Sequence, residues 1–185
     1  MTIGGTDYPI DIIGKNHDAY TAGGTAPLTF QMHDCYSAEY RMNSSGTNSG
    51  GWDSCEMRNT TLPSLLQQMP SEVQVGIKQV DKKTSIGDAT STIKVSSDKL
   101  FLLSEMEVFG NISLSYAGEG SWYEYYQSGT SVVNTQKKRN GVGNNWWIRS
   151  PANGVYDSFI NVQINGSSRS NYAAGATGVA FAFCF

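Results

Sequence analysis

Side chains suited to non-covalent binding gather in one stretch near the end of the chain, between Asn153 and Tyr172. Amides and hydroxyls there can adapt their hydrogen bonds to a polar ligand, and tyrosine buries a large area at low entropic cost. Apolar strands lie on both sides, so the scaffold would supply stability and this stretch would supply contacts. We expect Tyr156 and Tyr172 to be the anchors. The predicted ligand-binding residues are Asn153, Tyr156, Asp157, Ser158, Asn161, Gln163, Asn165, Ser167, Ser168, Ser170, Asn171 and Tyr172.

Two His-Asp pairs, His17-Asp18 and His33-Asp34, raise the alternative of catalysis with Ser54 or Cys35 as the nucleophile. Short polar pairs at strand ends more often form turns and bond the local backbone. We therefore predict a protein that is not an enzyme and has no catalytic residue and no cofactor. A divergent enzyme centred on Cys35, His33 and Ser54 stays open as the third hypothesis.

The three cysteines, Cys35, Cys55 and Cys184, cannot all pair, and their spacing matches no zinc pattern. No loop is dense enough in acidic residues to supply the converging oxygens that calcium needs. We predict no bound metal, and we expect the thiols to be reduced and mostly buried.

The composition limits the class of protein and its partners. With 185 residues, 39% of them hydrophobic, the chain can bury one substantial core, and we predict a single domain over residues 1–185. A formal net charge of -3 and a pI near 5.3 argue against nucleic acid as a partner. The basic run Lys137-Lys138-Arg139 is predicted to be a solvated loop. No apolar stretch could cross a bilayer and the start resembles no signal peptide, so we expect neither membrane insertion nor Sec export.

Apolar patterns in the first half predict three strands and a helix. Residues 8–14, 27–33 and 73–80 carry continuous or alternating apolar side chains, which favour strands. Thr61 or Ser64 is the expected helix cap, with Pro63 in the first turn and a stop at Pro70. The predicted buried face of that helix consists of Leu62, Leu65, Leu66 and Met69.

Residues 100–103 form a continuous apolar run that predicts another strand. Directly after it, Ser104 and Glu107 have the spacing of a capping box, so a short helix should begin there and end at Gly110. The aromatic stretch 121–128 is predicted to be either a helical turn or a surface loop.

The final third is expected to hold three strands. In Trp146-Trp147 the side chains point to opposite faces, so at most one is exposed, and packing is the favoured role. Arg149 is predicted to pair with Glu105 or Glu107. Residues 160–164 alternate, which predicts an apolar face and an amide-rich face, with a tight turn at Asn165-Gly166. Residues 179–185 should form a central strand buried on both sides.

Several phrases occur in a characteristic order. They are Ile12-Ile13-Gly14, Asn16-His17-Asp18, Gly50-Gly51-Trp52 with Ser54 and Arg58, Asp98-Lys99-Leu100-Phe101-Leu102-Leu103-Ser104-Glu105, Glu107-Val108-Phe109-Gly110, Trp146-Trp147-Ile148-Arg149-Ser150-Pro151, Gly178-Val179 and Phe181-Ala182-Phe183-Cys184. Together they resemble the DUF6273 family of gut bacteria and their phages. The chain departs from that pattern at Asn59-Thr60-Thr61-Leu62 and at Ala180, where a basic residue is expected.

The resemblance implies a C-type-lectin-like fold, shared with formylglycine-generating enzymes and with the variable proteins of diversity-generating retroelements. The expected architecture is α+β, with a small twisted antiparallel sheet flanked by two short helices and with long loops. Such relatives sit on phage tails or bacterial surfaces and bind protein or glycan through C-terminal loops. The chain lacks the calcium-binding triplets of calcium-dependent lectins, and neither Cys35 nor Cys55 has a basic neighbour to lower its pKa.

Two functions follow from these expectations. The first is a receptor-recognition domain on a virion or a bacterial cell surface, with a cell-surface protein or glycan as its partner. Retroelement diversification would fit it, because replacing adenines turns Asn codons into Ser, Tyr, Asp or Gly codons, which are frequent in residues 153–172. The alternative is a structural or assembly module of a phage particle, in which the same polar face contacts another subunit.

Overall fold

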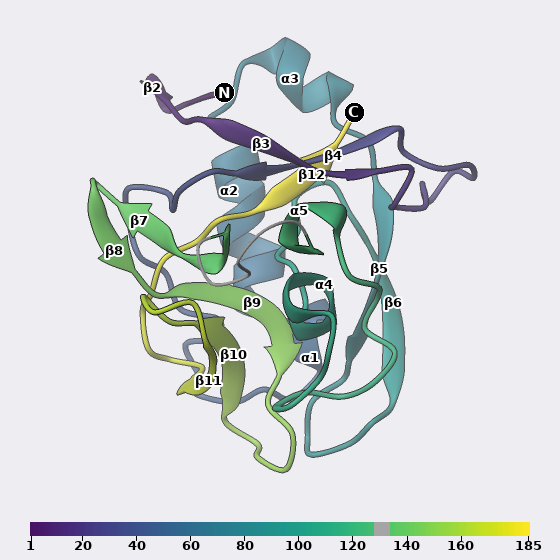
Figure 1. Cartoon of the computed structure of the whole chain (residues 1–185), viewed down its shortest axis with the longest axis vertical. Coiled ribbons are helices and arrows are strands. Elements are labelled where there is room, and N and C mark those ends of the chain that lie inside the picture. Colours follow the sequence, from purple (N-terminus) through teal and green to yellow (C-terminus); the bar gives the residue numbers. More distant parts are fainter. Residues whose placement is uncertain (128–133) are drawn as a thin grey trace.

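Small antiparallel sheets and short helices make up the computed structural model, which describes residues 1–127 and 134–185 (Figure 1). The α+β class is therefore confirmed. The elements are β1 (Thr2–Ile3), β2 (Thr6–Asp7), β3 (Ile10–Lys15), β4 (Leu28–Met32), α1 (Gly51–Ser54), the π-helix η1 (Met57–Thr61), α2 (Leu62–Leu66), α3 (Ser71–Gly76), β5 (Val80–Ser85), β6 (Ile93–Asp98), α4 (Glu105–Phe109), α5 (Glu124–Gln127), β7 (Lys137–Arg139), β8 (Val142–Asn144), β9 (Trp146–Pro151), β10 (Ser158–Val162), β11 (Ser168–Tyr172) and β12 (Ala182–Cys184).

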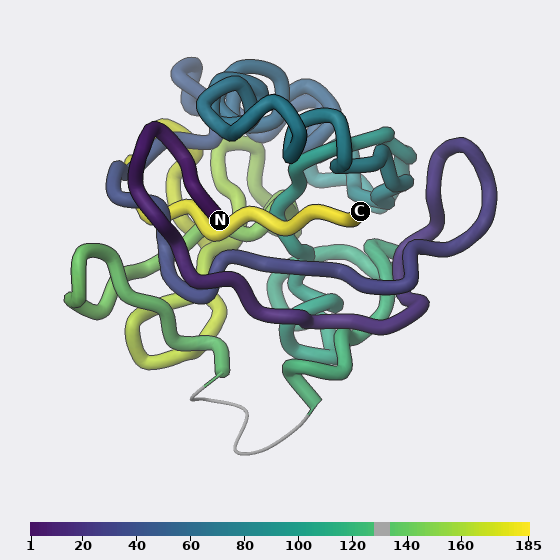
Figure 2. The backbone as a smooth tube through the Cα atoms, turned by 90° about the horizontal axis from the view of Figure 1, so that it is seen from above, coloured from purple at the N-terminus to yellow at the C-terminus, as the bar shows by residue number. Residues whose placement is uncertain are grey.

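Two three-stranded sheets form the frame, and the β5–β6 and β7–β8 hairpins lie beside them (Figure 1). One sheet has the order β12-β4-β3 and the other β11-β10-β9. Both termini lie near the first sheet, at the end where α3 packs, and the loop between β3 and β4 projects from the body (Figure 2).

The strands predicted at 8–14 and 27–33 are confirmed as β3 and β4, which pair antiparallel. The predicted terminal strand is wrong in extent, because only Ala182–Cys184 pair as β12, and β4 is the central strand. The outer edge of β12 is covered by single bridges from Phe101 to Ala182 and from Lys78 to Cys184. One side of β12 is therefore covered by segments that are not regular strands. The last predicted strand residue, Phe185, is 45% exposed.

The helix expected around Leu62 is present as α2, with Pro63 in its first turn and Leu62, Leu65 and Met69 buried. No side chain caps it, because the chain enters α2 directly from η1 with Thr61 already in helical geometry. The cap prediction was therefore wrong. A preceding helical turn supplies the carbonyl partners that an isolated helix start would lack.

The strand predicted at 73–80 is wrong over most of its length, because residues Ser71–Gly76 form α3. Pro70 is extended, and its carbonyl accepts from the amides of Val73 and Gln74, which begins a helical turn. Val75 is 75% exposed, so its alternation with Val73 and Ile77 does not mark a buried face. The strand β5 begins only at Val80.

Residues 100–103 are buried but form no regular strand, apart from the single bridge at Phe101. Two of their backbone carbonyls accept hydrogen bonds from Arg149. The carbonyl of Leu102 accepts from Nη1, and the carbonyl of Leu103 accepts from the backbone amide. The apolar run thus predicted burial correctly and strand pairing wrongly.

The capping box at Ser104 and Glu107 is confirmed, with both reciprocal hydrogen bonds made, and α4 ends at Gly110 with φ of 70°. Within the aromatic stretch 121–128, Glu124–Gln127 form the helical turn α5, and Ser128 lies outside the described residues. Tyr123 and Tyr126 are fully buried.

The prediction that Lys137-Lys138-Arg139 form a solvated loop is wrong. The run lies in strand β7, and Lys137 is 2% exposed, with Nζ donating to the carbonyls of Met32 at 2.7 Å and His33 at 2.9 Å. Burial lowers the pKa of this lysine to about 8. Among the helices that the structure describes, none is both long and apolar enough to span a membrane.

Candidate functional site

The predicted binding residues begin after β9 and continue through the β10–β11 hairpin (Figure 1). Tyr156 is 63% exposed and Tyr172 is 52% exposed. Five more of the twelve are exposed: Asn153, Asp157, Asn165, Ser167 and Ser170. Four are half-buried: Ser158, Gln163, Ser168 and Asn171.

Asn161 is only 2% exposed, so the predicted amide-rich outer face of this strand is wrong at that position. It lies in β10 between Trp147 of β9 and Arg169 of β11. In this middle strand both faces are covered over Phe159–Val162. Asn161 therefore has no access to a ligand in this structure, whereas Ile164, expected on the apolar face, is 58% exposed.

The hairpin divides ten of the remaining eleven residues into two groups, and Ser170, which lies opposite Ile160 in the middle of the ladder, belongs to neither. Ser158 pairs with Tyr172 at one end, and Val162 pairs with Ser168 at the other, four residues along each strand. At about 3.3 Å per residue the two ends are roughly 13 Å apart. We call the first group the tyrosine end, which comprises Asn153, Tyr156, Asp157, Ser158, Asn171 and Tyr172. The second group is the turn end, which comprises Gln163, Asn165, Ser167 and Ser168.

Side chains of the turn end mainly bond one another. The hydroxyl of Ser167 donates to Asn165 Oδ1 at 2.8 Å and to Gln163 Oε1 at 3.3 Å. The amide of Gly166 donates to the carbonyl of Gln163, which closes the tight turn that the sequence predicted. These groups stabilise the turn and are less available to an external ligand.

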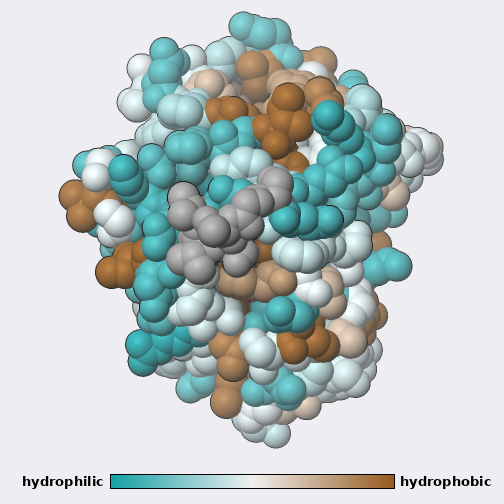
Figure 3. Space-filling view, viewed as in Figure 1, coloured by the Kyte–Doolittle hydropathy of each residue, from teal (hydrophilic) through white to brown (hydrophobic). Residues whose placement is uncertain are grey.

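The tyrosine end rests on a backbone that other loops hold in place. The carbonyl of Tyr156 accepts from the amide of Asn48 at 2.9 Å and from the hydroxyl of Thr47 at 3.1 Å. Tyr172 reaches back to the same loop, and its hydroxyl lies over Gly46. Both exposed rings thus project from ordered segments. On the face that Figure 3 displays, apolar residues form separate patches among hydrophilic ones.

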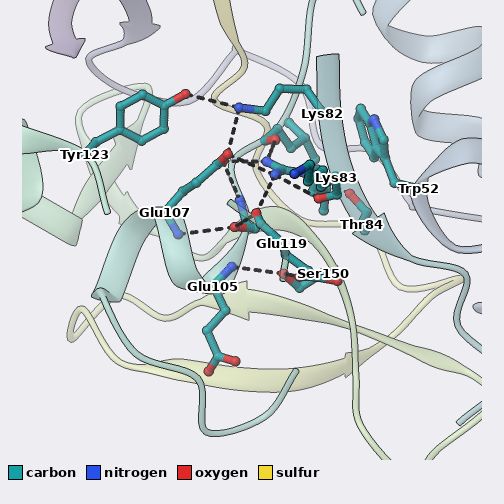
Figure 4. A network of polar contacts seen from close by, with 12 residues as sticks. Trp52, Lys82, Lys83, Thr84, Glu105, Glu107, Glu119, Tyr123 and Ser150 are labelled. Atoms are coloured by element: carbon teal, nitrogen blue, oxygen red, sulfur yellow. Dashed lines mark hydrogen bonds and ion pairs between the residues drawn. The ribbon is translucent and has the colours of Figure 1, made fainter. Parts of the chain in front are cut away.

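A buried charge network joins the β5–β6 hairpin, α4 and β9 (Figure 4). Arg149 is fully buried and pairs with Glu107, with Nη2 to Oε1 at 2.9 Å, which confirms one of its two predicted partners. Lys82 bridges Glu107 and Asp18, each at 2.7 Å from Nζ. Glu105 instead accepts from the Ser115 amide at 2.8 Å.

Opposing effects set the pKa values in this network. Burial, the largest single effect, would raise the pKa of Asp18, but the charge and hydrogen bond of Lys82, together with the hydrogen bonds from Thr29 and Tyr123, outweigh it and lower that pKa to about 2. Burial opposes ionisation of Glu107 in the same way, and Arg149 followed by Lys82 lowers its pKa. These carboxylates are therefore charged and paired, which makes them part of the frame.

Glu119 behaves differently, because burial raises its pKa to about 7 despite hydrogen bonds from Ser150 and the Ser85 amide. A raised folded-state pKa stabilises the fold below the unfolded value of 4.5, and this contribution is lost as the pH rises through about 7. We expect Glu119→Gln to remove most of that decline between pH 5 and 8, an effect on the order of 3 kcal/mol. Urea denaturation of both proteins across this range measures it, and parallel pH profiles would contradict it.

The two histidines of the catalytic alternative contact other side chains of the fold. His33 Nδ1 is 2.9 Å from Asp11 Oδ2, and the ring of His17 stacks on Tyr123 at 3.8 Å. Burial raises the pKa of the Cys35 thiol to about 12, which disfavours a thiolate nucleophile. Cys35, Cys55 and Cys184 are free and buried, as predicted. Across residues 1–127 and 134–185 no group of three or more His, Cys, Asp or Glu side chains has the arrangement for a metal ion.

Trp146 and Trp147 are fully buried, which confirms the packing role predicted for them, and Trp52 is fully buried as well. Trp52 Nε1 donates to Asp98, which also accepts from Arg58 at 2.5 Å. No sequence pattern marks Gly46 and Asn48 as part of the site, because both lie in a Gly/Ser/Asn stretch that is typical of any polar loop.

Comparison with known proteins gives a family assignment. The family described as a domain of unknown function (DUF6273) matches residues 28–185, which is most of the chain. A search of curated proteins found no match, and a search of solved structures found none either. The phrases that suggested the family from the sequence lie on the elements described above, including the buried β9 strand and α4. The chain belongs to the DUF6273 family.

Proposed function

We propose that this chain is a C-type-lectin-like domain that binds a protein or glycan on a cell surface through its tyrosine end. The observation that carries the proposal is the pair of tyrosines, 63% and 52% exposed, on backbone segments fixed by Asn48 and by the β10–β11 ladder. Exposed aromatic side chains on an ordered backbone bind with little loss of conformational entropy. The antiparallel sheets and the short helices fit the lectin-like fold that the resemblance to the family implies.

The charges around the tyrosine end favour a partner that is not a polyanion. Loops 43–50, 86–90 and 153–158 carry the carboxylates of Asp88 and Asp157 and no Lys or Arg. Arg169 alternates with Tyr172 along β11 and so points to the other face of the strand. Nucleic acid would be repelled here, so a cell-surface protein or glycan is the proposed partner. A virion or a bacterial cell surface is the proposed location.

An array of glycans and cell-surface proteins, probed with the purified chain, tests this function. We expect reproducible binding to a restricted set of spots, with unchanged binding for Val75→Ala, whose side chain is 75% exposed on α3 at the far end. Binding of the parent chain to no spot, or loss of its binding in the Val75→Ala control, would contradict the proposal.

Diversification by a retroelement is part of the proposal and makes its own prediction. A near-repeat of the coding sequence beside a reverse transcriptase gene should differ at adenines in codons of exposed residues such as Tyr156, Asp157 and Tyr172. Codons for Phe159–Val162 should be unchanged, because these side chains are buried. Sequencing the neighbouring DNA checks this. Differences spread equally over the buried codons would sink the idea.

A second candidate function is an assembly module of a phage particle, and exposed apolar side chains favour it. Val142 is 71% exposed in β8, and Ile164 is 58% exposed beside Gly143 of the same strand. These groups lie next to the turn end, so a subunit contact there would leave the tyrosine end free. Neighbouring tail or capsid genes, without a reverse transcriptase gene, would favour this candidate over the first.

A further inference from the structure

The loop before α1 is the centre of contacts at the tyrosine end. Asn48 is 0% exposed although it lies in a Gly/Ser/Asn stretch. Its amide Nδ2 donates to the carbonyls of Val155 at 2.9 Å and Ser158 at 3.0 Å. Its backbone amide donates to the carbonyl of Tyr156 at 2.9 Å. Three hydrogen bonds from Asn48 thus hold the loop that carries Tyr156.

Asn48 also joins this loop to the β5–β6 turn. Its Oδ1 accepts from the amide of Asp88 at 3.0 Å, and its carbonyl accepts from the amide of Gly51 at 2.9 Å. Each polar atom of the side chain is therefore used, and a buried amide that loses such partners leaves carbonyls unsatisfied. No smaller residue could make the same contacts.

Tyr172 depends on a different residue of the same loop. Gly46 has φ of 63°, and a Cβ placed on it would lie 2.0 Å from the hydroxyl oxygen of Tyr172 and 2.6 Å from Cζ. Glycine is needed here for the positive φ and for the space that the ring occupies. Any larger residue would push the ring of Tyr172 away from its place.

We propose that Asn48 and Gly46 are positioning residues of the tyrosine end: Asn48 fixes the backbone of Tyr156, and Gly46 leaves the space in which Tyr172 lies. The positions of the two rings do not depend on the proposed function, whereas the expected effect on ligand binding rests on it. The positions of the two rings can be measured without a ligand, so the two ideas fail separately.

Fluorine NMR of protein that carries 3-fluorotyrosine at its ten tyrosines tests the positioning directly. Tyr156→Phe and Tyr172→Phe assign the two resonances. We expect Asn48→Ala to shift the Tyr156 resonance toward that of free 3-fluorotyrosine, and Gly46→Ala to shift the Tyr172 resonance. Gly5→Ala is the matched control, because Gly5 has φ of 82° and nothing within 4 Å of the added Cβ.

Asn48→Ser serves if Asn48→Ala does not fold, because its single hydroxyl adds no buried charge and cannot replace both donated bonds to Val155 and Ser158. Folded Asn48 and Gly46 variants whose Tyr156 and Tyr172 resonances match the parent would overturn the inference. Binding of the same variants to the array gives the second readout, and we expect a loss of at least tenfold for Gly46→Ala and none for Gly5→Ala. Displaced rings with undiminished array binding would instead reject the tyrosine end as the binding surface.

Discussion

Replacing Glu107 with alanine is expected to lower the free energy of unfolding by about 3–5 kcal/mol, because it removes one partner from a buried ion pair. Glu107 is 1% exposed, and it pairs with Arg149 and Lys82 while its Oε2 also accepts from the Ser104 amide. The variant would leave the Arg149 guanidinium buried without its carboxylate and would open the cap of α4. Chemical denaturation at neutral pH measures the loss.

The control is Glu39→Ala, which breaks an ion pair with Arg139 at 3.2 Å in which each side chain is 33% exposed. We expect a loss below about 1 kcal/mol there, because solvent screens such pairs. If Glu107→Ala reduces stability too far to measure, Glu107→Gln, which keeps one acceptor, should fall between the two. Equal losses for Glu107→Ala and Glu39→Ala would show that the buried network does not support the fold.

The features that could be predicted from the sequence depend on neighbours along the chain. The capping box of Ser104 and Glu107 requires only a spacing of three residues, and it formed as predicted. Burial of Trp146 and Trp147 followed from their size and from strand geometry. Arg149 was predicted to pair with Glu105 or Glu107, which lie two residues apart on α4. In the structure Arg149 pairs with Glu107, and Glu105 accepts from Ser115.

The wrong predictions had two causes, which were the local backbone geometry and contacts between strands. Three alternating apolar residues from Val73 to Ile77 predicted a strand, but Pro70 begins a helix whose Val75 faces solvent. Asn161 and Lys137 were expected at the surface, yet the adjacent strands β9 and β11 cover Asn161, and Lys137 contacts the distant strand β4. The polarity of a side chain alone therefore does not show whether it is exposed.

The candidate site was predicted as a list of exposed residues, and the structure divides it. The tyrosine end and the turn end lie at opposite ends of one hairpin, which residue types alone could not separate. Asn48 acts through hydrogen bonds to backbone groups, and Gly46 acts by leaving the space that the ring of Tyr172 occupies. Neither role leaves a pattern in the sequence. Positions that support a site are therefore harder to predict than the side chains that form it.

Removing both exposed tyrosines is the second change with a large expected effect. An aromatic anchor at the centre of a binding surface contributes about 2 kcal/mol or more, roughly a 30-fold change in affinity for each ring. We expect Tyr156→Ala/Tyr172→Ala to lose at least that much affinity while keeping the parent's thermal stability. Both rings are more than half exposed, so the core is untouched.

The decisive measurement is the affinity of this double variant for the array component that the parent chain binds most tightly, made beside Val75→Ala. We expect a loss of about 30-fold or more for the double variant and none for Val75→Ala, with unchanged thermal midpoints for both. Parent-like affinity in the folded double variant would show that binding uses a surface other than the tyrosine end.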